Sequence, residues 1–544
     1  MAAVRGVPLA VWCITALHFT LLLTYSVLQP TYRSPDEFQH VDLAHAVSDD
    51  RHYPAWDERQ LSPGVYESMT IVRWQEESAH NRAEDAVPKS ERPSIEDLEA
   101  DPIASPPNPI AQHPPAWYFA AGGAERVVEV FIGDPSYDLE AWVYRLVSIL
   151  MVGPLPLVIW RAGRHLRLPP VVGIAATMVP LAIPEFTHIG SAANNDNLML
   201  LMFALLAPVV IRIAGGALHP RTAALAGAIT GIALFTKGFA MVLPLWGLAA
   251  IAVAWRRGGR EARGPALTAT VVYGLTSLVF GGWWWIKNLV VYQAINPSQV
   301  DAWIVEPENF DVDMNAFVRA WGYRTTQRFW GDFAGSGAHM PAIAFGLATL
   351  VVLVGMASGC RRRDRVAGIG LGERLLLAAP LLLLIATQFA FAFRGYIKTA
   401  SFPGMQGRYL FGAVASMSLI VVIGLANLMR RRDWRWLPPA MLLAVIDMHV
   451  FAITSVLRYF WEPPGTPLGD RVRAAVAWAP LPGELLAVGF GIGVLVLITT
   501  VAVVAYGTVR PPGPGSGDGD SEGDDAEDRP EEQGSDASRL VFVP

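Results

Sequence analysis

The stretch "VPLAVWCITALHFTLLLTYSVL", residues 7–28, contains no Asp, Glu, Lys or Arg. About 20 consecutive apolar residues in a helix cross the roughly 30 Å hydrocarbon core of a bilayer. The run therefore predicts a membrane-spanning helix. It is followed at once by "QPTYRSPDEFQH", residues 29–40, where charged side chains gather as the chain leaves the lipid.

The composition also indicates a protein that crosses the membrane many times. Of the 544 residues, 52% are hydrophobic and 17% are charged, whereas about a quarter of a soluble domain is charged. We expect an all-α integral membrane protein of about 12 transmembrane helices, with a domain over 1–506 and a disordered acidic tail over 507–544. The apolar runs lie near 7–28, 141–160, 170–187, 196–213, 221–236, 239–255, 264–286, 340–359, 374–393, 408–428, 437–455 and 484–506.

The arginines predict the orientation of these helices. Four clusters fall in short connections on one side if the runs alternate, and the positive-inside rule makes that side the cytoplasm. Both termini then lie in the cytoplasm of a protein of the plasma membrane, and the run at 221–236 is short enough to be tilted or partly re-entrant. The four clusters lie at 161–167, 256–263, 361–365 and 430–435.

Nearly all the distinctive polar clusters fall in the loops predicted on the outer side. A first loop over 29–140 is expected to carry interfacial helices anchored by Trp117 and Tyr118, and a second large loop covers 287–339. A transporter would place ionisable groups within its spans. Asp447 and His449 are the clear exceptions here, so the chemistry is expected at one membrane surface.

The motif "SPDEFQH", residues 34–40, has two interpretations. Ser34 as N-cap and Glu37 three residues later form a capping box, which explains the motif as a helix start. That box leaves Asp36 unused, and Asp36 and His40 share a helical face. A carboxylate there is a candidate base for a hydroxyl, or Asp36 and Glu37 together are candidate ligands of a divalent cation such as Mg²⁺ or Mn²⁺.

Other outer clusters supply cations and hydrogen-bonding groups. Each also has a structural explanation as a turn, a helix cap, an aromatic belt or a lysine reaching the headgroups. The candidates for binding a donor phosphate are Lys287, Arg394, Lys398 and Arg408. The candidates for binding the rest of the substrate are His40, His113, Asn195, Asp196, Lys237, Asn288, Asp332 and Tyr409.

Carboxylates, phosphate-binding cations and sugar-binding groups next to lipid favour an enzyme that uses a sugar on a polyprenyl phosphate. No Gly-rich nucleotide-binding loop occurs on the cytoplasmic side, and no nucleic-acid partner is expected. Two alternatives remain open. One is a flippase or transporter for lipid-linked sugars, seeded by Asp447 and His449, and the other is a non-catalytic protein of envelope assembly.

The order of several motifs resembles a group of uncharacterised bacterial membrane proteins, of actinobacterial type, that is similar to the GT-C glycosyltransferase superfamily. The resemblance covers about 1–506. It implies a multispan fold, a loop acid that falls on Asp36 with Glu37 adjacent, and sugar transfer from a lipid phosphate to a cell-envelope glycan, lipid or protein, with or without a metal. Decaprenyl-phosphate arabinose is the donor by analogy. The motifs are "SPDEFQH", "HPPAWYF", "RLVSILMVG", "NNDNLM", "TKG", "WWWIKN", "FWGDFAG" and "QGRYLF".

Overall fold

The computed structural model describes most of the chain. It covers residues 6–50, 52–76, 80–99, 105–298, 304, 307–308, 310–333, 337–361, 366 and 369–509. Within these residues the backbone forms helices joined by turns, with only isolated bridges between extended residues. The predicted all-α class is confirmed. Residues 510–544, for which the sequence predicts an acidic tail, lie outside the described residues.

Among the described residues, ten helical segments are long and apolar enough to cross a membrane. Several combine an α-helix with a neighbouring helical turn, because proline or glycine interrupts the regular hydrogen bonding. The segments are α1 (Leu9–Leu28), α6 and α7 (Tyr137–Val152, Leu155–His165), α10 (Asp196–Ala214), η4 and α12 (Gly238–Val242, Leu243–Gly258), α13, η5 and α14 (Arg263–Ser277, Leu278–Gly282, Trp283–Tyr292), α17 (Ala342–Gly359), α18 (Leu371–Thr399), η6 and α19 (Gly407–Ala413, Val414–Leu428), η7 and α20 (Arg431–Trp436, Leu437–Phe460), and α22 (Gly483–Val509).

Two of the twelve predicted spans do not form helices of that length. The run 170–187 divides into α8 (Pro170–Thr177) and α9 (Pro184–Gly190), since Pro180 lies in the turn between them and Pro184 starts the second helix. The run 221–236 forms α11 (Pro220–Leu234), whose 15 residues extend about 23 Å. It packs against α10 and α13.

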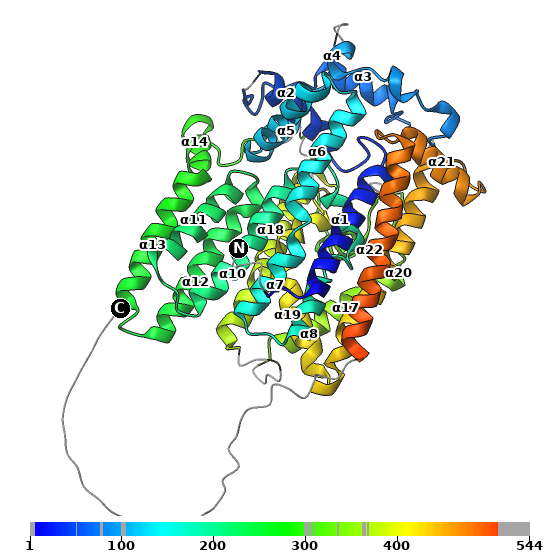
Figure 1. Cartoon of the computed structure of the whole chain (residues 1–544). Coiled ribbons are helices and arrows are strands. Elements are labelled where there is room, and N and C mark those ends of the chain that lie inside the picture. Colours follow the sequence, from blue (N-terminus) through cyan, green and yellow to red (C-terminus); the bar gives the residue numbers. More distant parts are fainter. Residues whose placement is uncertain are drawn as a thin grey trace, which may run out of the picture. The chain divides into compact units, whose positions relative to one another are not determined.

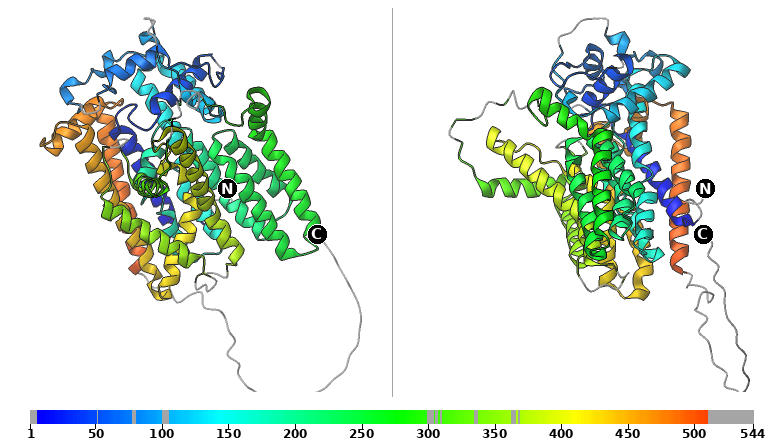
Figure 2. Two further views of the ribbon diagram at one scale, coloured as in Figure 1. Left: turned by 180° about the vertical axis from the view of Figure 1, so that it is seen from behind. Right: turned by 90° about the vertical axis from the view of Figure 1, so that its left-hand side faces the viewer.

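A group of short helices lies at one end of the bundle of long helices (Figures 1 and 2). We call this group the cap. It comprises α2 (Glu37–Asp50), α3 (Pro63–Ile71), η1 (Ala83–Asp85), η2 (Lys89–Glu91), α4 (Ile95–Leu98), η3 (Pro109–Gln112) and α5 (Ala116–Ile132). Two further helices outside the long segments are α16 (Met314–Trp330) and α21 (Leu468–Trp478).

Two of the connections that carry predicted cytoplasmic arginines lie at the opposite end of the bundle, whereas residues 362–365 of a third cluster lie outside the described residues. The connections from α12 to α13 and from α19 to α20 are both far from the cap (Figure 1). These two basic connections and the cap thus lie at opposite ends of the bundle, as expected if the spans alternate in direction.

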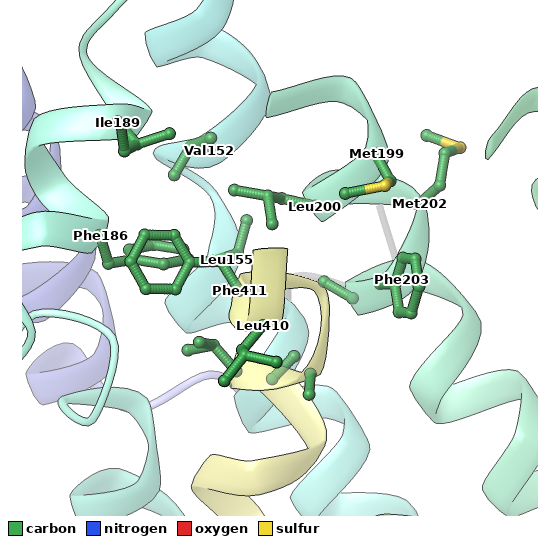
Figure 3. Packing of buried hydrophobic residues seen from close by; sticks show 14 of the residues in the cluster. Val152, Leu155, Phe186, Ile189, Met199, Leu200, Met202, Phe203, Leu410 and Phe411 are labelled. Carbon is green, nitrogen blue, oxygen red and sulfur yellow. The ribbon is translucent and has the colours of Figure 1, made fainter. Parts of the chain in front are cut away.

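An apolar core beneath the cap holds the elements that carry the charged residues discussed below. Phe186 of α9 packs edge-on against Phe411 of η6, with ring centroids 5.3 Å apart. Met199 and Phe203 of α10 approach the same region (Figure 3). This packing fixes η6 and the start of α10 relative to each other.

Close helix packing between α17 and α19 depends on glycine. A methyl group at Gly424 would lie 1.7 Å from the carbonyl oxygen of Gly355. Small residues allow helix backbones to approach closely in membranes.

Gly424→Ala should therefore push α17 and α19 apart and lower the thermal unfolding midpoint in detergent, because overpacking costs about 1–3 kcal/mol. Gly346→Ala on α17 is the matched control, since no atom lies within 4 Å of its added methyl group. Equal midpoints for the two variants would contradict the proposed packing constraint.

Candidate functional site

The loop between α1 and α2 does not form the predicted capping box. Helix α2 begins at Glu37, and the Ser34 hydroxyl bonds the His188 ring at 3.1 Å instead of capping the helix. Glu37 accepts the backbone N–H of Tyr32 at 3.0 Å, five residues back along the chain. The capping-box interpretation is therefore wrong, since both side chains of the expected box bind elsewhere.

Glu37 is the anchor of this loop. Its carboxylate receives two hydrogen bonds from Arg145 of α6, at 2.8 and 2.6 Å, and one from the N–H of Ala193 at 3.0 Å. Glu37 and Arg145 are both buried, and Arg145 also donates to the carbonyl oxygen of Ser26 at the end of α1. Because both of its oxygens accept hydrogen bonds, the Glu37 carboxylate connects the loop before α2, helix α6 and the turn at Ala193.

Asp36 points toward a different partner. It has a φ of 60°, a left-handed conformation that is uncommon for a non-glycine residue and clusters at functional sites. Its carboxylate is 46% exposed and pairs with Arg408 at 2.5 Å. Arg408 also donates to the Pro35 carbonyl at 3.3 Å. The turn thus separates the two adjacent acids, with Glu37 buried in the fold and Asp36 at a charged cluster.

Arg408 is buried and retains a spare donor. Its Nε–H has no hydrogen-bond partner within the described part of the chain. Burial alone would raise the pKa of Asp36, but the positive charge of Arg408 outweighs it and lowers the pKa to about 2. Asp36 is therefore a stable carboxylate while it remains paired with Arg408.

A second ion pair lies beside the first. Lys237 approaches Asp196 at 2.7 Å and donates to Asn195 at 3.3 Å. The ring of Tyr409 lies near both cations, 5.8 Å from the Lys237 ammonium and 5.7 Å from the Arg408 guanidinium. Residues predicted from four separate motifs meet here.

Two histidines complete the cluster. His40 bonds the Tyr118 hydroxyl at 2.9 Å. Burial and the charge of Lys237 lower the pKa of His40 well below its ordinary range, and the same two causes lower the pKa of His113 to about 3. Both imidazoles are neutral at physiological pH. We name the assembly of Asp36, His40, His113, Asn195, Asp196, Lys237, Arg408 and Tyr409 the charged site.

Asp332 lies in a neighbouring cluster. It pairs with Arg328 at 3.0 Å and His339 at 3.3 Å, and its N–H donates to Glu185 at 2.8 Å. Glu185 also lies 3.3 Å from His188, the ring that bonds Ser34. Burial and the charge of Glu185 raise the pKa of Asp332.

The remaining predicted cations are not part of the Asp36–Arg408 pair. Lys287 stacks on the rings of Trp284 and Tyr292, at 4.5 and 4.7 Å, and Asn288 donates to the Ile295 carbonyl. Arg394 and Lys398 lie near the end of α18.

The arrangement does not fit a cation shared by Asp36 and Glu37. Both oxygens of Glu37 are engaged by Arg145 and backbone N–H groups, and the Asp36 carboxylate holds Arg408. We therefore assign no metal-dependent role to Asp36 and Glu37.

Sequence reasoning missed several residues that matter here. Trp117 and Tyr118 were expected at the headgroup level but are fully buried, and Tyr118 holds His40. Arg145 and Glu185 lie within runs counted as apolar. The signal that the sequence offered was a charged residue within an apolar run, because a charge that is buried there must have a partner.

The fold and the charged site define an all-helical, multispan membrane protein with an ionic cluster at the capped end of its bundle. The chain belongs to the family described as "Predicted membrane protein (DUF2142)", whose model matches residues 19–417. No curated protein matches it.

Solved structures show a distant likeness. ArnT from Cupriavidus metallidurans bound to undecaprenyl phosphate is similar with a TM-score of 0.45 and 13% identity, over 91% of this chain and 74% of that one. The apo oligosaccharyltransferase of Archaeoglobus fulgidus gives a TM-score of 0.43 and 10% identity, over 87% of this chain and 57% of that one.

Glu37→Gln should destabilise the protein strongly, because it leaves the buried Arg145 guanidinium without a balancing charge, at a cost of about 3–5 kcal/mol. The free energy of unfolding in detergent and denaturant measures this. Glu84→Gln is the control, since it removes one partner of an exposed pair with Arg82. A loss no larger than that of the control would contradict the anchoring role of Glu37.

The pKa of His113 predicts an acid sensitivity. As the pH falls below about 6.5, the unfolded chain binds a proton at His113, whereas the folded protein does so only near pH 3. Stability from this residue is complete above pH 6.5 and is lost progressively below it. The thermal midpoint should therefore fall more between pH 7 and pH 5 in the wild type than in His113→Asn. An identical fall in both proteins would rule out a neutral, buried His113.

Proposed function

We propose that this protein is a GT-C-type glycosyltransferase that transfers a sugar from a polyprenyl-phosphate donor to a glycan, lipid or protein of the cell envelope. The observation that supports it most is the pairing of Asp36 with Arg408 at the capped end of a membrane bundle. There a carboxylate, two cations and aromatic rings lie together. The basic connections at the opposite end favour a cytoplasmic location for them, which puts the charged site on the extracytoplasmic face of the plasma membrane.

Arg408 is the proposed ligand of the donor phosphate. Its planar guanidinium matches the geometry of phosphate oxygens, and its Nε–H, which has no partner among the described residues, can add a hydrogen bond to the phosphate. Lys237 also lies near the Tyr409 ring, and its positive charge favours an anion bound close to Arg408. A phosphate bound here competes with Asp36 for the guanidinium.

This competition prepares Asp36 for catalysis. While Arg408 holds Asp36, the carboxylate is a weak base with a pKa of about 2, far from the value near the operating pH that favours proton transfer. When Arg408 turns to the phosphate, Asp36 loses its strongest positive neighbour and its proton affinity rises. Binding of the donor thus activates the base.

The proposed transfer has two coupled bond changes. The acceptor hydroxyl oxygen bonds to the anomeric carbon of the sugar while the bond from that carbon to the phosphate oxygen breaks, and its electron pair stays on the phosphate. The hydroxyl proton passes to the Asp36 carboxylate. Arg408 and Lys237 stabilise the charge that develops on the leaving phosphate.

Aromatic side chains provide a surface for the sugar or the acceptor. Tyr53 contacts Tyr118 at one side and Trp284 at the other, with ring centroids 5.6 and 6.3 Å apart. Trp284 in turn carries Lys287 on its face. This row leads from the charged site to Lys287, and the half-buried rings of Tyr53 and Trp284 leave part of their surface for a sugar.

The transporter alternative has less support. His449, one of its two proposed seeds, bonds the Tyr25 hydroxyl at 3.0 Å and the Leu181 carbonyl at 2.8 Å. Both ring nitrogens are thus used within the fold. Asp447 is exposed on α20.

Asp36→Asn should reduce transfer by about 10²–10⁴-fold, the usual contribution of a general base. It should lower the thermal midpoint less than Glu37→Gln does, because the Asp36 side chain is 46% exposed. The measurement is release of polyprenyl phosphate by purified protein from a panel of polyprenyl-phosphate sugars that includes decaprenyl-phosphate arabinose. Asp447→Asn is the matched control and should transfer at the wild-type rate. Full activity in Asp36→Asn, or its loss in Asp447→Asn alone, would contradict the proposal and favour transport.

A further inference from the structure

A second cluster of ionisable groups lies further along α2, away from Asp36. It forms where α2, α5 and α6 meet, and each helix contributes one side chain. His45, Glu125 and Glu140 each place a nitrogen or oxygen atom within 4.8 Å of the other two. Their side chains are buried, with exposed fractions of 4%, 1% and 0%.

The hydrogen bonds inside this cluster leave acceptor capacity unused. His45 Nδ1 lies 3.0 Å from Glu140 Oε1. The Tyr144 hydroxyl approaches both Glu125 and Glu140, but it has a single proton and can donate to only one of them at a time. Glu140 Oε2 has no hydrogen-bond partner among the described residues. A fully buried carboxylate oxygen without a partner is costly.

The charge of the cluster is also unbalanced. Glu96 of α4 lies 4.0 Å from His45 Nδ1, and Glu96, Glu125 and Glu129 form a second group of mutually close carboxylates. His45 is the one group among these that can carry positive charge. Glu125 and Glu140 are buried close to each other, and neighbouring buried carboxylates require neutralisation by protons or by a cation.

We propose that His45, Glu125 and Glu140 bind a divalent transition-metal ion, with Glu96 as the fourth ligand and Zn²⁺ as the best match. Zn²⁺ takes His nitrogen and carboxylate oxygen at about 2.0–2.2 Å in a tetrahedron, which places ligand atoms roughly 3.3–3.6 Å apart. The separations of His45 Nδ1 from Glu140 and Glu96, 3.0 and 4.0 Å, lie on either side of that value. Small side-chain shifts bring these two pairs to the separation that Zn²⁺ ligands require.

The ion ties the cap to the membrane bundle. His45 lies on α2, which also carries His40, and Glu125 lies on α5, which carries Tyr118, the partner of His40. Glu140 lies at the start of the long α6–α7 segment. A metal at this junction holds α2 and α5 in the position that the His40–Tyr118 contact requires. The proposal does not depend on sugar transfer and applies equally to a non-catalytic protein.

The test uses the full-length protein in detergent after treatment with a chelator. Zn²⁺ is added in competition with a chromophoric chelator, and bound metal is counted by mass spectrometry. The wild type should bind one Zn²⁺ per chain, and Glu125→Gln should lose tenfold or more in affinity, by analogy with the roughly 10–100-fold effects of groups around metal sites. Zn²⁺ should also raise the thermal midpoint of the wild type, since a ligand stabilises the state that binds it.

Three further variants make the result specific. Glu91→Gln changes an exposed glutamate elsewhere in the cap and should bind Zn²⁺ as the wild type does. Asp36→Asn changes the charged site but not this cluster, so it should also bind Zn²⁺ as the wild type does. Glu96→Gln alters a ligand that is 43% exposed, so it should fold even if Glu125→Gln does not, and it should bind more weakly. No stoichiometric Zn²⁺ in the wild type, or wild-type affinity in both Glu96→Gln and Glu125→Gln, would overturn the proposal and leave protonated carboxyl groups as the explanation.

Discussion

The buried ion pair between Glu37 and Arg145 is the contact on which the arrangement of the charged site depends. Arg145 comes from a membrane-spanning segment and reaches the carbonyl oxygens at the end of α1 as well as Glu37. Glu37 also holds the turn before α10 through Ala193. Breaking such a pair on one side leaves a charge in a place without water. These contacts hold the loop between the first span and the cap in the conformation in which Asp36 has a left-handed backbone and pairs with Arg408.

Arg408 then has to serve two anions. In the structure it neutralises Asp36, and in the proposed reaction it neutralises the donor phosphate. One guanidinium that exchanges between them couples binding to activation, because the carboxylate becomes basic only when the phosphate takes its partner. Asp196 and Lys237 form a second pair nearby, so the site as a whole is close to neutral before the substrate binds. An incoming phosphate changes that balance and is favoured by both cations.

The sequence predicted the membrane class and most of the spans, because runs of about 20 predominantly apolar residues are typical of membrane-spanning helices. It failed at 170–187, where hydropathy alone hides the effect of Pro180 and Pro184 on the backbone. Asp36, Lys237 and Arg408 were chosen as candidates from separate outer loops, and the fold brings them together. The partner of each was not predictable, because Asp36 and Arg408 are 372 residues apart and local patterns carry no information on that distance.

The assignment of the two adjacent acids shows the same limit. A local reading used Glu37 for a capping box, whereas its actual partner, Arg145, is 108 residues away. His45, Glu125 and Glu140 escaped notice for a related reason, since each looks like an ordinary residue of an amphipathic helix until the three helices pack. Pairing of buried charges is decided by tertiary structure, and an isolated charge in an apolar segment signals only that some partner exists.

The exchange of Arg408 between Asp36 and phosphate is the central claim, and the affinity for a polyprenyl phosphate without sugar tests it most directly. Titration of that lipid into wild-type protein and Asp36→Asn in detergent, with Arg408→Ala as reference, gives three dissociation constants. If Asp36 competes for the guanidinium, Asp36→Asn should bind the lipid more tightly than the wild type, and Arg408→Ala more weakly. Weaker binding in Asp36→Asn, or unchanged binding in Arg408→Ala, would contradict the claim.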